Sequence, residues 1–215
     1  FEGVYNSQEE IDKHPHLPTD TPGDPIVKDV NTDGKITPDD RTILGNYQPD
    51  FTYGLNNTLR YKGFDLSFFL QGVYGNEVMN LGMYQTGSMT GRTNSKGMAR
   101  DRWRSPENPG NGKVFKASID VYGVRRDAST FFMEDGSYIR VRDITLGYNF
   151  NSDLLKTIKI SSVRVYLSSL NPFTFAKYSG YNPEVSTYDN ALTPGIDYFN
   201  YPLSKNLILG INITF

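Results

Sequence analysis

The side chains best suited to chemistry lie in one short acidic run, and the chemistry they suit is cation binding. Residues 29–40 read DVNTDGKITPDD. This spacing follows a calcium-binding loop, in which oxygens at positions 1, 3, 5, 7 and 12 surround the ion and a glycine at position 6 makes the sharp turn. The predicted ligands are the side chains of Asp29, Asn31, Asp33 and Asp40 and the backbone carbonyl of Lys35.

The predicted cofactor is Ca²⁺, a hard cation that takes six to eight oxygen ligands, with Mg²⁺ as the alternative. Asp40 stands where such loops usually carry Glu, and its shorter side chain reaches less far. A competing interpretation needs no ion. Thr37 followed by Pro38 is typical of a helix start, and the acids would then only cap a short helix that ends at Gly45. No second loop pairs with this one, so we expect a structural staple and not a calcium sensor.

The composition excludes several other functions. The chain has no cysteine, which removes disulfides, thiolate nucleophiles and thiolate metal sites. A formal net charge of -2 gives no sign of a nucleic-acid partner. No histidine-based or carboxylate pair has catalytic spacing, so we predict that the chain is not an enzyme, and no substrate-binding residue can be named.

The elements around the acidic run alternate apolar and polar residues with a period of two, which indicates strands. In the last ten residues, Leu207, Leu209, Ile211 and Ile213 share one face, and the chain stops at Phe215. Lys62-Gly63 predicts a tight turn between the first two strands. The strands are predicted at 51–61, 63–74, 138–150, 158–170 and 206–215.

The connections between these strands are alternately short and long. Residues 151–157 form a short link, whereas 75–137 and 171–205 are long and lack periodicity. Bacterial outer-membrane barrels have short periplasmic turns, long extracellular loops, and strands of about 10 residues with one apolar face. We therefore predict an all-β fold, the C-terminal strands of a large antiparallel transmembrane β-barrel, with an extracellular loop at 1–50 and barrel strands and loops at 51–215.

Five strands cannot close a barrel, and open edges in lipid leave backbone groups unpaired. The chain begins at Phe1 without a methionine, so we expect it to be a piece of a longer product that supplies the remaining strands. The alternative is a secreted, calcium-stapled β-sandwich that binds a glycan or a protein partner. A sandwich would bury residues such as Leu66 and Leu209 against a second sheet, whereas a barrel presents them to lipid.

Several motifs together resemble the C-terminal part of SusC/RagA-type TonB-linked outer-membrane proteins of Bacteroidota. The resemblance covers nearly the whole chain and is weakest at 75–137. The motifs are KDVNTDGKI at 28–36, DRTILGN at 40–46, FTYGL at 51–55, YKGFDLSFFLQG at 61–72, NPFTF at 171–175, GYNPE at 180–184, and YPL at 201–203 with the final strand.

This resemblance implies a protein of the bacterial outer membrane with a 22-stranded barrel and an internal plug. It implies import of oligosaccharides or peptides, driven through TonB, which would be contacted by the N-terminal remainder of the same protein. It also implies a SusD-like lipoprotein as a lid, with outer-membrane lipid around the barrel. The acidic run, 75–137 and 171–205 would then be extracellular, and the turns at 62–63 and 151–157 periplasmic.

Overall fold

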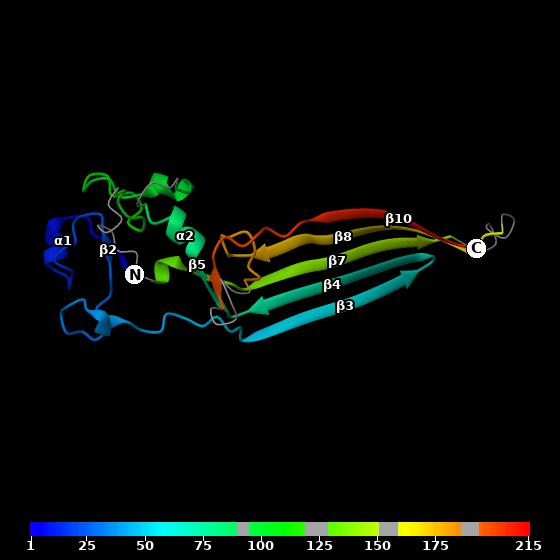
Figure 1. Cartoon of the computed structure of the whole chain (residues 1–215), viewed down its shortest axis with the longest axis horizontal. Helices are drawn as coiled ribbons and strands as arrows, with labels where there is room; N and C mark the ends of the chain where they lie inside the picture. Colours follow the sequence, from blue (N-terminus) through cyan, green and yellow to red (C-terminus); the bar gives the residue numbers. More distant parts are fainter. Residues whose placement is uncertain (90–94, 119–128, 151–158, 186–193) are drawn as a thin grey trace. The chain divides into compact units, whose positions relative to one another are not determined.

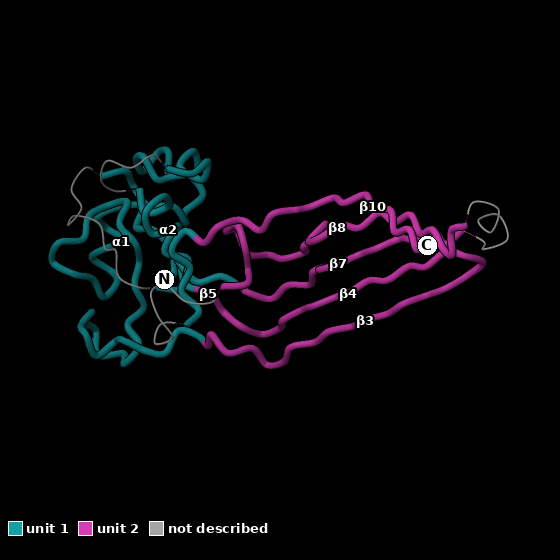
Figure 2. Tube along the Cα trace, turned by 45° about the vertical axis from the view of Figure 1, so that its right-hand side comes forward, with its two compact units in different colours: residues 1–45, 79–134, 187–199 teal, residues 46–78, 135–186, 200–215 magenta. Residues whose placement is uncertain are grey.

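The computed structural model describes residues 1–89, 95–118, 129–150, 159–185 and 194–215. The chain forms two compact units (Figure 2). Unit 1 comprises residues 1–45, 79–134 and 187–199, and unit 2 comprises 46–78, 135–186 and 200–215. This differs from a division at residue 50, because most of the two long connections joins residues 1–45 in unit 1 and does not stay with the strands.

Unit 2 is a five-stranded antiparallel sheet in the order β10-β8-β7-β4-β3 (Figure 1). Neighbouring strands run side by side over most of their length. At 9 to 15 residues the strands are long compared with the usual five or six. Their bounds are β3 Phe51–Tyr61, β4 Phe64–Tyr74, β7 Tyr138–Asn149, β8 Ser162–Ala176 and β10 Asn206–Thr214.

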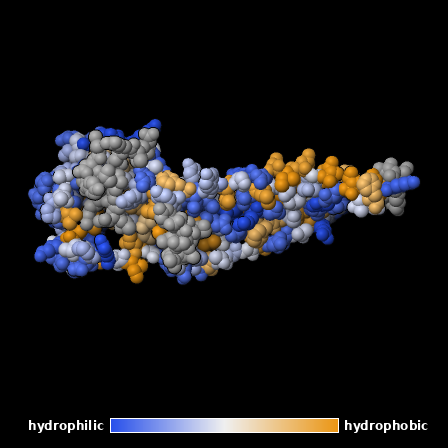
Figure 3. Space-filling view, viewed as in Figure 1, coloured by the Kyte–Doolittle hydropathy of each residue, from blue (hydrophilic) through white to orange (hydrophobic). Residues whose placement is uncertain are grey.

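The register separates an apolar face from a polar face across all five strands. One unbroken row on the apolar face joins five leucines, each directly paired with the next: Leu59, Leu66, Leu146, Leu167 and Leu209. The polar face carries Arg60, Asp65 and Tyr166 in the adjacent row. Figure 3 shows hydrophobic residues gathered along β10 and hydrophilic ones over the middle of the sheet.

The apolar face is open to its surroundings. Leu207 and Leu209 are each 74% exposed, and Ile211 and Ile213 are also exposed. This exposure is opposite to what the sandwich interpretation requires, in which these residues would be buried against a second sheet. A contiguous apolar surface of this extent indicates a membrane or a protein partner.

The turn at Lys62-Gly63 is the two-residue turn that the sequence predicts. Both residues have positive φ, 45° and 88°, as a type I′ turn requires. A Cβ on Gly63 would also lie 3.0 Å from the carbonyl oxygen of Asn149, so glycine is needed for both reasons. The turn fixes the register in which Tyr61 faces Phe64.

Strand β8 differs most from its predicted range of 158–170. It begins at Ser162, after a turn in which Lys159 has a φ of 56°, and continues to Ala176, so the predicted loop 171–205 begins six residues late. In the sequence, Asn171-Pro172 indicates the end of a strand, because proline has no backbone N–H to donate to a neighbouring strand. Here the pairing with β7 shifts at this point, and β10 ends its pairing at Leu170, so the missing N–H costs no ladder bond.

Unit 1 is built from short elements. The residues outside the long strands include β1 Gly3–Val4, α1 Gln8–Asp12, β2 Pro25–Ile26, η1 Pro38–Asp40, α2 Leu81–Thr86, η2 Gly97–Asp101 and η3 Thr130–Phe132. A three-stranded sheet has the order β6-β5-β9, with β6 at Met133–Asp135, β5 at Glu77–Asn80 and β9 at Ile196–Asp197. The predicted loop 75–137 therefore contains regular structure that its lack of periodicity does not reveal.

Residues from distant segments form the core of unit 1. Val4, Phe115 and Phe132 are buried together, and Phe1 packs on Phe115 with ring centroids 5.5 Å apart. Full burial of each such side chain contributes about 1.5–3 kcal/mol. This core explains why 79–134 folds with the N-terminal segment.

The segment after Thr37 forms less helix than the sequence predicts. The helix predicted from Thr37 to Gly45 is only the single 3₁₀ turn Pro38–Asp40; Ile43 is fully in solvent, so a longer helix would have no apolar face to pack. The predicted link at 151–157 lies outside the described residues. Among the described residues, none of the helices has the length and apolar character needed to span a membrane.

Candidate functional site

The acidic loop of unit 1 is wrapped around its own carboxylates. Asp29 accepts the backbone N–H groups of Thr32 (2.7 Å) and Gly34 (2.8 Å). Gly34 has a φ of 80° with open space where a Cβ would lie, so backbone conformation, and not crowding, requires the glycine. Hydrogen bonds within the loop itself therefore stabilise the backbone conformation of the predicted calcium loop.

Asp40 closes this loop from its far end. Its carboxylate accepts the Thr37 N–H (2.7 Å) and reaches back to the Val30 N–H (2.8 Å). These hydrogen bonds, that from Thr37 first, hold the pKa of Asp40 below its usual value, although partial burial acts in the opposite direction. A side-chain contact with Asp29 contributes to the same lowering, so the carboxylates of loop positions 1 and 12 lie together.

The other predicted ligands are turned toward their own backbone. Asp33 accepts the Lys35 N–H (2.8 Å) and the Asn31 side-chain amide (3.2 Å), and Asn31 accepts the Asp33 N–H. Among the described residues, no three His, Cys, Asp or Glu side chains gather closely enough to hold a metal ion. The structure therefore brings Asp29 and Asp40 together but leaves Asp33 outside that pair.

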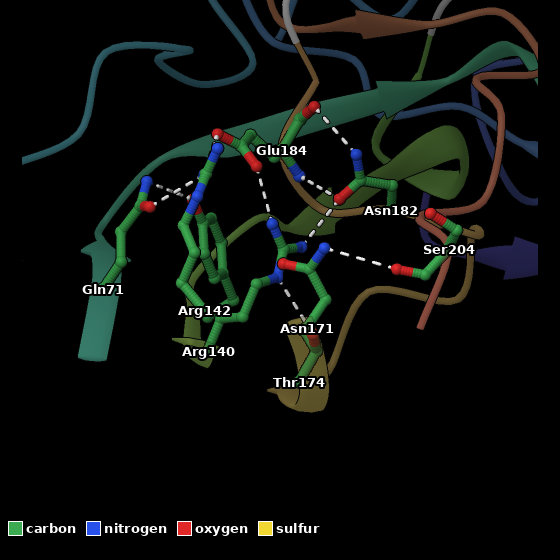
Figure 4. Close-up of polar contacts among 9 residues, drawn as sticks. Gln71, Arg140, Arg142, Asn171, Thr174, Asn182, Glu184 and Ser204 are labelled. Carbon is green, nitrogen blue, oxygen red and sulfur yellow. Dashed lines mark hydrogen bonds and ion pairs between the residues drawn. The ribbon is translucent and has the colours of Figure 1, made fainter. Parts of the chain in front are cut away.

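A second polar site lies on the polar face of unit 2, and sequence reasoning did not find it. We call it the arginine cluster (Figure 4). It consists of Gln71 from β4, Arg140 and Arg142 from β7, Thr174 from β8, and Asn182 and Glu184 from the segment 177–185. No periodicity connects these residues, which lie up to 113 positions apart in the sequence (71 to 184).

Arg140 is the centre of this cluster. Its side chain is only 1% exposed, and it donates to Glu184 (2.6 Å), Asn182 (2.8 Å) and Thr174 (2.9 Å). The guanidinium also lies 5.0 Å from the centroid of the Tyr138 ring. A buried charge is stable only when it is paired and hydrogen-bonded in this way. Arg140 thus holds the segment 177–185 on the sheet.

A third polar group lies near the Lys62-Gly63 turn. Arg164 binds Asp65 through two nitrogens, at 2.5 and 3.0 Å, and Asn149 adds a bond to Asp65 at 2.8 Å. The guanidinium covers Gly147, where a Cβ would lie 2.5 Å from it. This ion pair links β4 to β8 across β7 and stabilises the polar face. Neither it nor the arginine cluster combines a nucleophile with a base.

No family model matches the chain. It is 33% identical over 219 residues to TonB-dependent receptor P26 of Formosa agariphila, covering 100% of this chain and 22% of that protein. It is 31% identical over 201 residues to TonB-dependent receptor SusC of Bacteroides thetaiotaomicron, covering 91% of this chain and 18% of that protein.

Solved structures agree with these relatives. The RagAB peptide importer in its closed-closed state matches with a TM-score of 0.68 and 25% identity over 85% of this chain and 19% of that chain. The open-open state matches in fold, with a TM-score of 0.67. The chain belongs to the SusC/RagA-type family of TonB-dependent receptors. The resemblance seen in the sequence is thereby confirmed.

Membership of this family explains why the sheet has one apolar and one polar face. The five strands of this SusC/RagA-type chain are part of the wall of a large transmembrane β-barrel, and we expect the exposed leucine row to lie on its outer surface. We expect the polar face, with the arginine cluster, to line the interior. The chain spans about a fifth of the length of the curated relatives it matches. These relatives are receptors and not enzymes, as the sequence predicted, and the secreted sandwich is not supported.

Proposed function

We propose that this chain is the C-terminal wall and outer vestibule of an energy-coupled outer-membrane importer of oligosaccharides or peptides. The observation that carries the proposal is the five-strand leucine row on the exposed face of a chain from this receptor family. One structural neighbour is a peptide importer, which supports peptides as one of the two substrate classes.

The importer would work in the bacterial outer membrane. Its barrel is completed and plugged by the remainder of the same protein, which also contacts TonB. The Lys62-Gly63 turn would face the periplasm, and the residues of unit 1 the outside. A SusD-like lipoprotein would cover the vestibule. With no catalytic set in the described residues, we expect substrate to pass chemically unchanged.

Transport is tested by TonB dependence in cells that carry the full-length receptor. Uptake of labelled oligosaccharide or peptide should fall to the level of receptor-null cells when TonB is deleted, because a plugged barrel does not pass substrate freely. Undiminished uptake without TonB would show a passive porin, and cleaved substrate in the medium of purified receptor would show an enzyme. Deleting 75–137 is a poor test, since it removes Phe115 and Phe132 from the core of unit 1.

We further propose that the acidic loop binds Ca²⁺ as a structural staple, with Mg²⁺ as the competing ion. The adjoining carboxylates of Asp29 and Asp40 support this, because a cation would neutralise two like charges held together by backbone hydrogen bonds. Asn31, Asp33 and the Lys35 carbonyl would supply further oxygens once Asp33 turns toward the pair. Outside the cell, a millimolar affinity is sufficient for such a module.

Calcium should therefore protect the loop. At a tenfold excess of Ca²⁺ over Kd the expected stabilisation is about 1.4 kcal/mol, seen as roughly tenfold slower amide exchange over residues 29–40. Asp29→Asn should remove this protection. Asp39→Asn, next to Asp40 in the 3₁₀ turn but outside the ligand set, should keep it. Equal exchange in Ca²⁺ and in chelator for the wild type would refute the site, and protection by Mg²⁺ alone would reassign it.

A further inference from the structure

The arginine cluster contains one guanidinium, that of Arg142, whose N–H groups are not all hydrogen-bonded within the cluster. Arg142 donates through Nη1 to the Gln71 side chain at 2.9 Å, and the same nitrogen lies 3.5 Å from Glu184 (Figure 4). Within the part of the chain that the structure describes, Nε and Nη2 of Arg142 have no hydrogen-bond partner. The side chain is 47% exposed. One edge of the guanidinium is therefore anchored, and the other edge is open.

The backbone explains why Arg142 points into the barrel. Against β4, Asp143 pairs with Phe69 and Val141 with Leu70, which makes Arg142 the extra residue of a β-bulge on β7. Its contact with Gln71, which pairs directly with Arg140, places its tip on the polar face. Bulges often re-aim a side chain at a functional site. The bulge thus adds a second arginine to the face that Arg140 already occupies.

The charges around Arg142 also favour an anionic ligand. Glu184 is the carboxylate that contacts both arginines, and its closer bond, 2.6 Å, goes to the buried Arg140. Asp143, the next residue along β7, forms no ion pair with Arg142. The positive charge of Arg142 is therefore only weakly compensated. Its open edge carries two parallel N–H donors, the arrangement that binds a carboxylate in a bidentate manner.

We infer that Arg142 is a ligand-binding residue that recognises a carboxylate group of the imported substrate on the inner wall. This inference rests on the proposed import function and narrows its substrate class to anionic molecules. The carboxylate can come from a peptide, at its C-terminus or an acidic side chain, or from a uronic-acid residue of an oligosaccharide. Gln71 and Glu184 are the positioning residues, since they hold the anchored edge.

Binding is measured by titration calorimetry on the purified full-length receptor with four probes: an acidic peptide, the same peptide with amidated carboxylates, an oligouronate, and its neutral reduced counterpart. We expect one carboxylate probe to bind. Arg142→Gln should weaken it at least tenfold, with Arg142→Lys intermediate because lysine keeps the charge but loses the fork. Neither substitution should change the binding of the neutral counterparts. Lys177→Gln, an exposed cation of the same unit, is the control and should change nothing.

The outcomes separate the two proposals. If neither carboxylate probe binds the wild type, or Arg142→Gln affects carboxylate and neutral probes equally, the role of Arg142 is wrong. The probe that binds distinguishes a peptide ligand from a glycan ligand. TonB-dependent uptake is measured in a separate experiment, so failed uptake with Arg142-dependent binding would reject import and leave the carboxylate site standing.

Discussion

Replacing Arg140 with alanine should release the segment 177–185 from the sheet at a cost of about 3 kcal/mol. Breaking a buried ion pair costs about 3–5 kcal/mol when the remaining charge stays buried. Here the remaining charge is on Glu184, whose side chain is 40% exposed and can be hydrated, so the lower end of that range applies. Asn182, which is buried, also loses one of its two donors and keeps only the backbone N–H of Glu184.

This cost is local, so it is best measured by amide hydrogen exchange on the full-length receptor in detergent. A loss of about 3 kcal/mol corresponds to exchange more than a hundredfold faster in 177–185. Arg142→Ala provides the matched control. It removes an arginine from the same strand, and that arginine contacts the same glutamate at the longer distance of 3.5 Å. A half-exposed pair contributes at most about 1 kcal/mol. Equal effects of the two substitutions would contradict the central role of Arg140.

The strands could be predicted from the sequence because their signal is local. Alternating residues in 51–61 and 206–215 define a face without reference to any other segment, and Lys62-Gly63 sets its own turn. The structure has strands at Phe51–Tyr61 and Asn206–Thr214. The error at β8 has a local cause as well, since Asn171-Pro172 usually ends a strand and only the neighbouring register explains why it does not.

The arginine cluster and the core of unit 1 could not be predicted in the same way. Phe115 and Phe132 are scattered in a stretch without periodicity, and only the fold brings them to Val4. Arg140 looks like any polar residue on the inward face of a strand, and its partner Glu184 is 44 residues away. The one available signal was the motif GYNPE at 180–184, which contains both Asn182 and Glu184.

Placing arginine at Leu209 should cost about 2 kcal/mol, and more at Leu207. A charged residue on the lipid side of a barrel costs about 2–4 kcal/mol at the middle of the membrane and 0–1 near its edges. Leu209 lies two residues from Ile211, whose row contains Tyr61, Phe64 and Tyr148 as an aromatic border. Leu207 lies two residues further from that border. The cost should appear in urea-dependent folding of the full-length receptor into phosphatidylcholine vesicles.

Ile208 gives the matched control, because it is an apolar neighbour on the opposite face, paired with Ser168. Ile208→Arg should cost less than 1 kcal/mol, since its side chain faces the polar interior of the barrel and not lipid. A nitroxide label tests the same assignment without unfolding the protein. At position 209 the spin relaxation of the label should be accelerated mainly by oxygen, which dissolves in lipid. At position 208 it should be accelerated mainly by a water-soluble nickel chelate. If each reagent accelerated relaxation equally at both positions, the leucine row would not face lipid.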